Sequence, residues 1–437
     1  MICAPHPTIP TLLRVFLKIG LLSFGGPAGQ IALMHRVLVD EEKWIDEPQF
    51  LAGLNFCMLL PGPEAMQLAT YVGWTLRGVT GGVIAGVLFV LPGFCVIVAL
   101  SMAYVLLQGL PWFAGVFLGL KAAVLAVVIE ALLRVARRAL KGRLAVALAV
   151  LSFLALFLFQ VPFPVVVLIA GLIGAVASRV EAAQASMPSA STLRRDGAGA
   201  TAGGLARTVL LWGGLWLAGL AAAALLSGPD GLFTRMALFF AQMAVVTFGG
   251  AYAVLSYVAQ AAVETLGWLK PGEMIDGLAL AETTPGPLIL VLTYVGFLAA
   301  FRDPGGLPPL VAGLAGAVLT TWMTFIPCFL WIFAGAPYLD RIRANRALSG
   351  ALAAITAAVV GVILNLSVWF ALQTLFRTVP TVSAGWLTVS LPQWSSLDPV
   401  ALLLAVLAAV MLFVLRLGLA ATLAVSAGAG FLLGTLV

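Results

Sequence analysis

The stretch Leu59-Leu60-Pro61-Gly62-Pro63-Glu64 decides how this chain folds. It lies inside an apolar segment, from about residue 49 to 76, that is long enough to cross a bilayer as a helix. Proline lacks a backbone N–H and clashes with the preceding helical turn, so two prolines around a glycine interrupt the helix here. A break within hydrocarbon leaves unpaired N–H and C=O groups, which are tolerated only where protein or a water-filled cavity covers them. The stretch is therefore a candidate site.

The second half of the chain repeats this pattern. Thr284-Pro285-Gly286-Pro287 interrupts another apolar segment, from about residue 273 to 301. The same four-residue sequence, Thr-Tyr-Val-Gly, follows both breaks, at residues 70–73 and at 293–296. Further positions correspond at a constant offset: Phe16 with Phe240, Ser23-Phe24-Gly25-Gly26 with Thr247-Phe248-Gly249-Gly250, Trp44 with Trp268, and Gly53 with Gly277. Recurrence in register indicates a duplicated structural unit.

The composition is that of an all-α polytopic membrane protein. Hydrophobic residues make up 62% of the 437 residues, charged residues make up 9%, and the mean hydropathy is +1.12. These values lie far from those of soluble domains. We expect about thirteen transmembrane segments, near residues 12–37, 49–76, 80–107, 112–136, 143–160, 163–180, 205–227, 234–260, 273–301, 306–336, 347–376, 396–415 and 417–436.

An odd number of segments suits two six-span repeats joined by one extra helix. Residues 1–180 form the N-terminal repeat, 181–230 a linker with the connecting helix, and 231–437 the C-terminal repeat. One connecting helix makes the repeats point in opposite directions, which is the plan of many secondary transporters. The Phe-Gly-Gly and Pro-Gly-Pro motifs are expected to break helices in both repeats.

The basic residues predict the orientation. The net charge is +6, and the arginines and lysines cluster between apolar segments, so the partner is the bilayer and not a nucleic acid. The positive-inside rule places the N-terminus in the cytoplasm, with the cluster 134–143 and the cluster 341–346 on that side. Re-entrant Pro-Gly-Pro hairpins would move these clusters to opposite sides. We therefore expect both Pro-Gly-Pro segments to cross the membrane.

Several functions are disfavoured. The chain has two histidines and four cysteines without a Cys-x-x-Cys pair, so we expect no metal site and no cofactor. It has no nucleotide-binding signature, which disfavours an ATP-driven pump. An intramembrane enzyme, for example a lipid transferase, would need a catalytic constellation that the sequence lacks. A lipid-moving or structural protein is a further alternative, and it predicts that Lys121 and Glu64 can be replaced freely.

The breaks suggest a site for an anion. A helix that restarts after a break directs unpaired N–H groups and a positive dipole end at the gap. The hydroxyl groups beside the breaks are additional donors. The alternatives are close helix packing at the glycines and a structural kink at the prolines. The candidate substrate-binding residues at the breaks are Ser23, Gly25, Gly26, Pro61, Gly62, Pro63, Thr247, Gly249, Gly250, Thr284, Pro285, Gly286 and Pro287, with Thr283 as a further hydroxyl.

Three ionisable residues in the apolar segments extend this site. Lys121 lies in the middle of a span, where a charge normally faces a cavity or a partner, and it is a candidate counter-charge for the anion. Its alternative role is a salt bridge to an intramembrane acid. Glu64 and Glu282 flank the two breaks and are candidates for proton coupling or for pairing with Lys121. For Glu64 a favourable contact with the helix dipole is the alternative.

These motifs together resemble the bidomain form of the chromate ion transporter family. The resemblance covers both halves, through Phe24-Gly25-Gly26-Pro27, the acidic loop ending in Trp44, Leu60-Pro61-Gly62-Pro63, Thr70-Tyr71-Val72-Gly73, Gly119-Leu120-Lys121-Ala122-Ala123 and Thr284-Pro285-Gly286-Pro287. It implies a bacterial inner-membrane protein that exports chromate and confers resistance to it. A sulfate or other oxyanion importer or exchanger on the same scaffold is the rival interpretation. A homodimer is left open.

Overall fold

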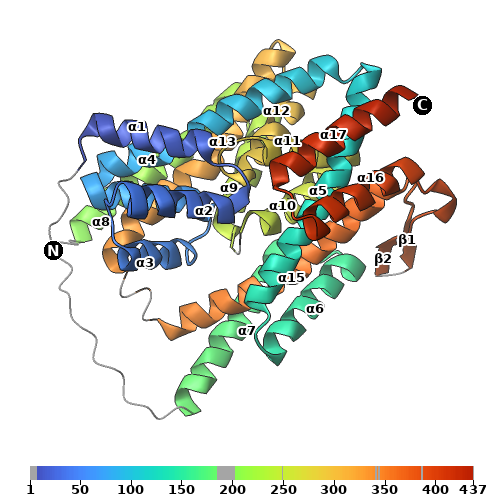
Figure 1. Ribbon diagram of the computed structural model, residues 1–437. Coiled ribbons are helices and arrows are strands. Elements are labelled where there is room, and N and C mark those ends of the chain that lie inside the picture. Colours follow the sequence, from blue (N-terminus) through green and yellow to red (C-terminus); the bar gives the residue numbers. More distant parts are fainter. Residues whose placement is uncertain are drawn as a thin grey trace.

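The computed structural model describes residues 7–184, 202–248, 250–339, 342, 345–384 and 387–436, and nearly all of them are helical (Figure 1). The helices of the first half and the connection are α1 (Ile9–Leu22), α2 (Gly26–His35), α3 (Glu47–Cys57), α4 (Glu64–Leu107), α5 (Pro111–Ala139), α6 (Arg143–Phe159), α7 (Phe163–Gln184) and α8 (Ala202–Ser227). Those of the second half are α9 (Leu232–Val246), α10 (Ala251–Gln260), α11 (Pro271–Thr283), α12 (Val291–Arg302), α13 (Pro309–Gly335), α15 (Arg346–Leu375), α16 (Pro399–Ala409) and α17 (Leu419–Leu436).

Short irregular elements lie between these helices, including the 3-10 turns Leu288–Leu290, which leads into α12, Ala336–Tyr338 and Trp394–Ser396. Single π-helical turns continue α2 (Arg36–Glu41), α10 (Ala261–Thr265) and α16 (Val410–Val414). A β-hairpin lies between α15 and α16, where β1 (Thr381–Ala384) pairs antiparallel with β2 (Leu387–Ser390). Six helices among the described residues are long and apolar enough to cross a membrane, within α4, α5, α7, α8, α13 and α15. The chain is a multi-pass α-helical membrane protein, as its composition predicts.

Local sequence signals set the starts of several helices. Asp46 caps α3 by accepting a hydrogen bond from the Gln49 N–H at 2.8 Å, and Pro48 follows in the first turn. Asn345 and Asp398 cap α15 and α16 in the same way. These side chains satisfy N–H groups that have no partner inside the helix.

The Phe-Gly-Gly motifs are the turns of helical hairpins. The Lys18 ammonium of α1 lies 3.1 Å from the Glu41 carboxylate at the end of the α2 segment, and the Phe16 and Trp44 rings are 6.5 Å apart. In one continuous helix, residues 18 and 41 would lie about 34 Å apart. The chain therefore turns back at Gly25 and Gly26, so that α2 returns along α1.

The Pro-Gly-Pro motifs are hairpin turns as well. Gly53 of α3 packs directly against the Tyr71 ring of α4, and the Phe56 and Tyr71 rings are 5.9 Å apart. A continuous helix would separate residues 53 and 71 by about 27 Å. The arms of the four hairpins run for about 15–24 Å, which is short of the roughly 30 Å of bilayer hydrocarbon. The Pro-Gly-Pro segments therefore turn back on themselves, whereas the sequence predicted broken helices that continue across the membrane.

Aligned residues make the same contacts in both halves. Gly277 of α11 packs on the Tyr294 ring of α12, as Gly53 packs on Tyr71. The Phe240 and Trp268 rings are 6.1 Å apart, which repeats the contact between Phe16 and Trp44. The second half thus contains the same two hairpins, α9 with α10 and α11 with α12.

The long helix α4 is two helices joined by a sharp turn. Arg77 and Gly78 leave helical geometry, and Gly78 has a φ of 61°, which glycine adopts readily. Gly73 consequently lies against the Gly81 backbone across the turn. Residues 64–76 therefore belong to the hairpin with α3, and residues 79–107 form a separate long helix.

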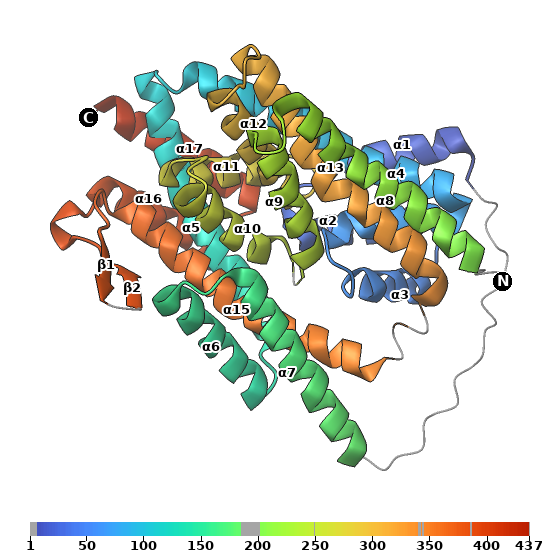
Figure 2. The ribbon, with the colours of Figure 1, turned by 180° about the vertical axis from the view of Figure 1, so that it is seen from behind.

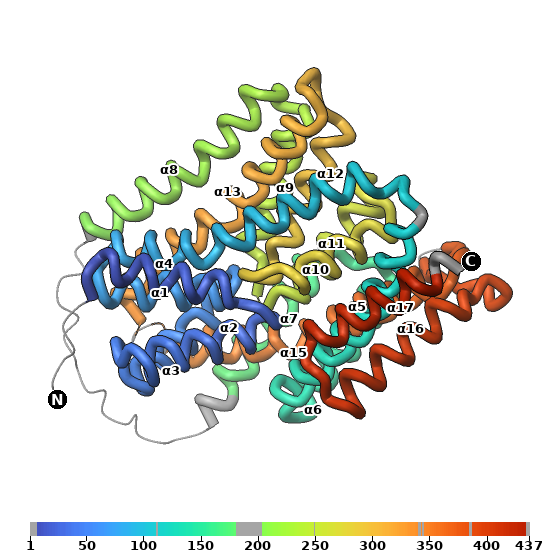
Figure 3. The backbone as a smooth tube through the Cα atoms, turned by 45° about the horizontal axis from the view of Figure 1, so that its top comes forward, coloured from blue at the N-terminus to red at the C-terminus, as the bar shows by residue number. Residues whose placement is uncertain are grey.

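The two halves are interlocked. Helix α5 of the first half packs against α16 and α17 of the second, and α15 of the second half packs against α6 and α7 of the first. Figure 2 shows α6 and α7 lying along α15, and Figure 3 shows α17 and α16 beside α5. Helices α1, α2, α3 and α8 lie on the other side of the molecule, and α10 and α11 lie in the middle, in contact with α15 and α5 respectively (Figure 3). Each half therefore contributes helices to the bundle around the other.

Cysteine labelling tests the hairpin arrangement. In a background without the native cysteines, Lys43→Cys and Thr80→Cys should both react with a membrane-impermeant maleimide from one side, because α3 and residues 64–76 return to their starting side. Lys270→Cys and Asp303→Cys should also share a side. Labelling in right-side-out and in inverted membrane vesicles shows which face each cysteine occupies. Labelling of positions 43 and 80 from opposite faces would show that the segment between them crosses the membrane.

Candidate anion site at the helix breaks

The four hairpin tips meet and exchange backbone hydrogen bonds. The Gly62 N–H donates to the Thr247 carbonyl at 2.8 Å, and the Gly286 N–H donates to the Ser23 carbonyl at 2.8 Å. The Pro-Gly-Pro tip of each half is thus bound to the Phe-Gly-Gly tip of the other. These bonds pair groups that the breaks would otherwise leave unsatisfied.

Glycine is required at the centre of both Pro-Gly-Pro tips. Gly62 has a φ of 123° and Gly286 a φ of 89°, a region that residues with a Cβ rarely adopt. The space is also limited, since a Cβ on Gly62 would lie 2.7 Å from the Gln67 side-chain nitrogen. The Pro285 carbonyl is equally confined, because it lies against Gly93 of α4.

A cavity lies where the four tips meet. Its volume is about 20 Å³, counted as space open to the centre of a water molecule. Its lining comes from the starts of α2, α4, α10 and the turn that leads into α12, namely Pro27, Gln30, Pro63, Glu64, Ala65, Gly250, Ala251, Pro287, Leu288 and Ile289. First-turn N–H groups have no partner within their own helix, and the dipole makes these ends positive. The arrangement therefore favours a negatively charged guest.

The cavity has to widen before it holds a tetrahedral oxyanion. A single water needs roughly 10–15 Å³ by the same measure, so the closed cavity has room for about one water. Pro63, Pro287 and Gly250 belong to the hairpin tips that enclose it. Movement of the tips relative to one another would change its size directly.

Two glutamines that the sequence analysis did not single out support the tips. The Gln30 amide nitrogen donates to the Gly286 carbonyl, and the Gln67 amide nitrogen donates to the Pro61 carbonyl, both at 2.6 Å. Both side chains are buried, and their oxygens have no hydrogen-bond partner among the described residues. A lone amide in an apolar helix next to a break was the signal that would have identified them.

The hydroxyl groups proposed as anion donors are used within their own helices. Ser23 donates to the Ile19 carbonyl at 2.6 Å, and Thr247 donates to the Met243 carbonyl. Thr283 and Thr284 both donate to the Leu280 carbonyl, at 2.9 and 2.6 Å. None of these residues lines the cavity, so each hydroxyl would have to rotate before it could bind an anion.

The predicted glycines form the Phe-Gly-Gly turns. Gly25 and Gly26 have φ values of 85° and 72°, and Gly250 has a φ of 97° and lines the cavity. Gly249 lies outside the described residues. The glycines therefore place the starts of α2 and α10 at the centre of the protein.

The two predicted acids occupy different positions. Glu64 lines the cavity as the first residue of α4, where the helix dipole favours its charge. Glu282 is buried outside the cavity lining and accepts a hydrogen bond from the Tyr252 hydroxyl at 2.6 Å. Neither acid is paired with Lys121.

Lys121 forms an ion pair away from the cavity. Its ammonium lies 3.2 Å from one carboxylate oxygen of Asp276 in α11, and the Tyr104 hydroxyl donates to the other oxygen at 2.9 Å. Asp276 is 4% exposed, so the lysine compensates a carboxylate that is almost fully buried. Lys121 is not among the residues that line the cavity. A salt bridge to an intramembrane acid was the alternative, but the sequence did not identify the partner.

Comparison with known proteins assigns the family. The sequence profile described as "Chromate transporter" matches residues 10–175 and 234–432, which include both sets of hairpins. The chain belongs to the chromate transporter family. Its two matched regions correspond to the two halves seen in the fold. Members of this family are transporters, not enzymes.

Similar proteins support this family assignment, because they too are named chromate transport proteins. The chain is 33% identical over 384 residues to a chromate transport protein of Pseudomonas aeruginosa, covering 87% of this chain and 85% of the relative. It is 31% identical over 382 residues to a probable chromate transport protein of Synechococcus elongatus, covering 87% and 89%. A chromate transport protein of Cupriavidus metallidurans is 30% identical over 389 residues, covering 89% and 88%. No solved structure matches the chain.

Replacement of the tip glycine should destabilise this transporter. Gly62→Ala places a Cβ at a φ that is almost restricted to glycine, which costs about 2–3 kcal/mol. Gly305→Ala is the matched control, because Gly305 has a φ of 58° with open space around it and should cost about 1 kcal/mol. Thermal unfolding in detergent measures the stability of both variants. An equal loss of stability would show that the fold does not depend specifically on the backbone conformation of the tip.

Charge removal separates two roles of Lys121. Lys121→Met leaves the Asp276 carboxylate uncompensated and should destabilise the protein by about 3 kcal/mol. The double variant Lys121→Met/Asp276→Asn should recover most of this stability. If Lys121 also binds the substrate, the stable double variant will still fail to transport chromate. Normal transport by the double variant would limit Lys121 to a structural role.

Proposed function

We propose that the chain is a secondary transporter that exports chromate from the cytoplasm and so confers resistance to it. The family assignment supports chromate as the substrate. The observation that carries the site is the convergence of helix starts from both halves on one cavity. Half-helix N-termini near the middle of a membrane protein are a recurrent means of binding anionic groups.

The proposed topology has nine crossings and four re-entrant hairpins within the described residues. Each half supplies two hairpins and four crossings, and α8 connects them. The crossings are residues 79–107 of α4, then α5, α6, α7, α8, α13, α15, α16 with its π turn, and α17. Because α8 is a single crossing, the halves are inverted relative to one another, as the sequence analysis expected.

This topology retains the predicted orientation with fewer crossings. Turning back at both motifs in each half leaves the cluster 134–143 and Arg346 on the same side as the N-terminus. Arg77, Arg207 and Arg416 also fall on that side. The positive-inside rule then predicts that the N-terminus lies on the cytoplasmic side of a bacterial plasma membrane. Re-entrant Pro-Gly-Pro hairpins therefore do not put the basic clusters on opposite sides, because the Phe-Gly-Gly motifs turn back as well.

Export agrees with the energetics of a dianion. The inside-negative potential is worth about 2.3 kcal/mol per charge per 100 mV, so it favours outward movement of chromate by about 4.6 kcal/mol per 100 mV. The potential alone is therefore a sufficient driving force. Import of the same ion would require coupling to another gradient.

In the proposed mechanism the oxyanion is held by the first-turn N–H groups of α2, α4 and α10, together with those of Leu288 and Ile289 in the turn that leads into α12. A positive charge on α5 stands next to this site, because Arg138 lies 3.9 Å from the Met58 sulfur, just before the first Pro-Gly-Pro tip. Since α5 ends on the proposed cytoplasmic side, Arg138 would attract the anion on entry. Alternating access then requires the tips of one half to move relative to those of the other.

Glu64 is the proposed proton-coupling residue. Its carboxylate lines the cavity, so its charge would oppose an incoming dianion at close range. Protonation of Glu64 on anion binding would remove this repulsion. Glu282 remains a candidate charge partner through its contact with Tyr252 near the start of α10.

The rival function is transport of sulfate or another oxyanion, as an importer or exchanger. Sulfate has the tetrahedral shape and double charge of chromate, and backbone N–H groups recognise those properties and not the central atom. The proposed site therefore fits both ions, and competition between them is expected.

Transport into everted membrane vesicles tests the proposal. Vesicles that contain the protein should accumulate labelled chromate when the interior is positive, and excess sulfate should reduce this uptake. Collapse of the potential should abolish it. Uptake no greater than in vesicles lacking the protein, at confirmed expression, would contradict export of chromate.

A further inference from the structure

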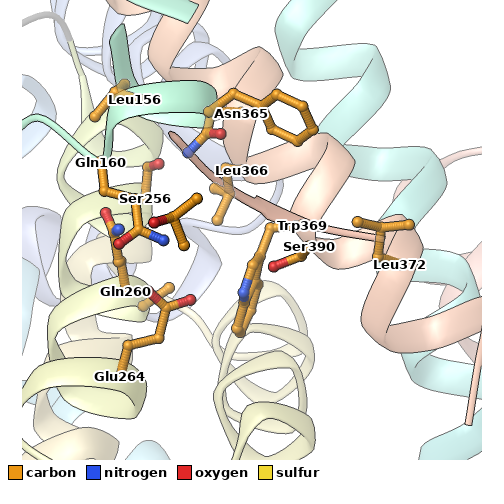
Figure 4. A pocket seen from close by; sticks show the side chains of 13 residues that line it. Leu156, Gln160, Ser256, Gln260, Glu264, Asn365, Leu366, Trp369, Leu372 and Ser390 are labelled. Carbon is orange, nitrogen blue, oxygen red and sulfur yellow. The ribbon is translucent and has the colours of Figure 1, made fainter. Parts of the chain in front are cut away.

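A second cavity lies away from the helix breaks, between the end of α6, the end of α10, α15 and strand β2 (Figure 4). Its volume is about 50 Å³ by the measure used above, which is room for about three to five waters. The polar groups that line it are mainly uncharged oxygen donors. They include the amides of Gln160, Gln260 and Asn365, the hydroxyls of Ser256 and Ser390, and the carboxylate of Glu264.

Glu264 gives this cavity a single negative charge. No lysine, arginine or histidine is among the residues that line it. The side chains beside the Glu264 carboxylate in the cavity include Gln260 and the Trp369 indole, which Figure 4 shows facing it. Both neighbours are neutral, so they leave the negative charge of Glu264 uncompensated. A chromate-like anion is disfavoured here by electrostatic repulsion.

The neutral groups are suited to coordinate a hard cation. Ser256 donates its hydroxyl proton to the Val362 carbonyl at 3.3 Å, so its oxygen lone pairs remain as acceptors. Amide carbonyl oxygens are ligands of the same kind. Divalent sites generally use more charge, and no group of three His, Cys, Asp or Glu side chains suited to a metal occurs in the part of the chain that the structure describes. One carboxylate with several neutral oxygens matches a single positive charge.

We propose that this cavity is a binding site for a small monovalent cation of the Na⁺ type, with Glu264 as the charged ligand. Glu264 is on the exposed side of the cavity, so the ion has access to it. Helix α10 joins this site to the helix breaks, because Ala251 at its start lines the central cavity and Gln260 at its end lines this one. An ion bound at Glu264 would therefore fix the helix that carries one wall of the anion cavity.

Direct binding of ²²Na⁺ to the full-length protein in nanodiscs tests the site without relying on transport. With choline chloride to keep the ionic strength constant, the protein should bind Na⁺ saturably, at one ion per chain. Glu264→Gln should weaken the affinity about tenfold or more, because it removes the only charged ligand. Asp230→Asn is the matched control, since Asp230 is an exposed acid in the loop between α8 and α9, outside the cavity. It should leave binding unchanged.

Ser390→Ala provides a second variant that is independent of the folding of Glu264→Gln. Ser390 is on the β-hairpin at the edge of the molecule, and its loss should weaken Na⁺ binding by a smaller factor. Absence of saturable binding would overturn the proposal. So would Na⁺ affinities equal to the parent protein in both cavity variants, or displacement of Na⁺ by Ca²⁺ at much lower concentrations. Any of these results leaves the proposed chromate export to be judged by its own experiment.

Discussion

The structure depends on the exchange of backbone hydrogen bonds between the hairpin tips of the two halves. Each break in a helix creates polar groups that the bilayer cannot satisfy. Here the Gly62 N–H is paired with the Thr247 carbonyl and the Gly286 N–H with the Ser23 carbonyl. The satisfied groups hold the tips together, and the helix starts beyond them remain directed at the cavity. The same arrangement thus makes the breaks tolerable and concentrates positive helix ends at one place.

Two-fold similarity between the halves is strong in packing and weak in charge. Gly53 and Gly277 pack on Tyr71 and Tyr294 in the same way. By contrast, the ion pair of Lys121 and Asp276 has no counterpart. Thr356 occupies the position aligned with Lys121 and donates its hydroxyl to the Leu352 carbonyl, while Ala52 is aligned with Asp276. The ion pair therefore joins α5 of the first half to α11 of the second, while the aligned positions in α15 and α3 carry no charge.

The sequence predicted the helix breaks and their meeting but not the path of the chain beyond them. Proline and glycine determine that a helix ends, which is a local effect. Whether the next helix continues or returns depends on contacts such as Gly53 with Tyr71, and a pattern of apolar residues does not specify them. The partner of Lys121 was missed for a similar reason, because Asp276 is 155 residues away and reaches it only through the packing of α5 on α11. Gln30 and Gln67 were not predicted, because an uncharged amide costs less to bury than a charge and therefore indicates a site less strongly.

The central claim is that the anion binds among the starts of α2, α4 and α10 and the turn that leads into α12. The most direct test is an experimental structure with bound chromate, in which anomalous scattering of chromium locates the ion. The account predicts a peak beside Pro63 and Gly250, within hydrogen-bonding distance of first-turn N–H groups from both halves. A peak beside Lys121 with Asp276 displaced, or one remote from all four of these segments, would contradict it.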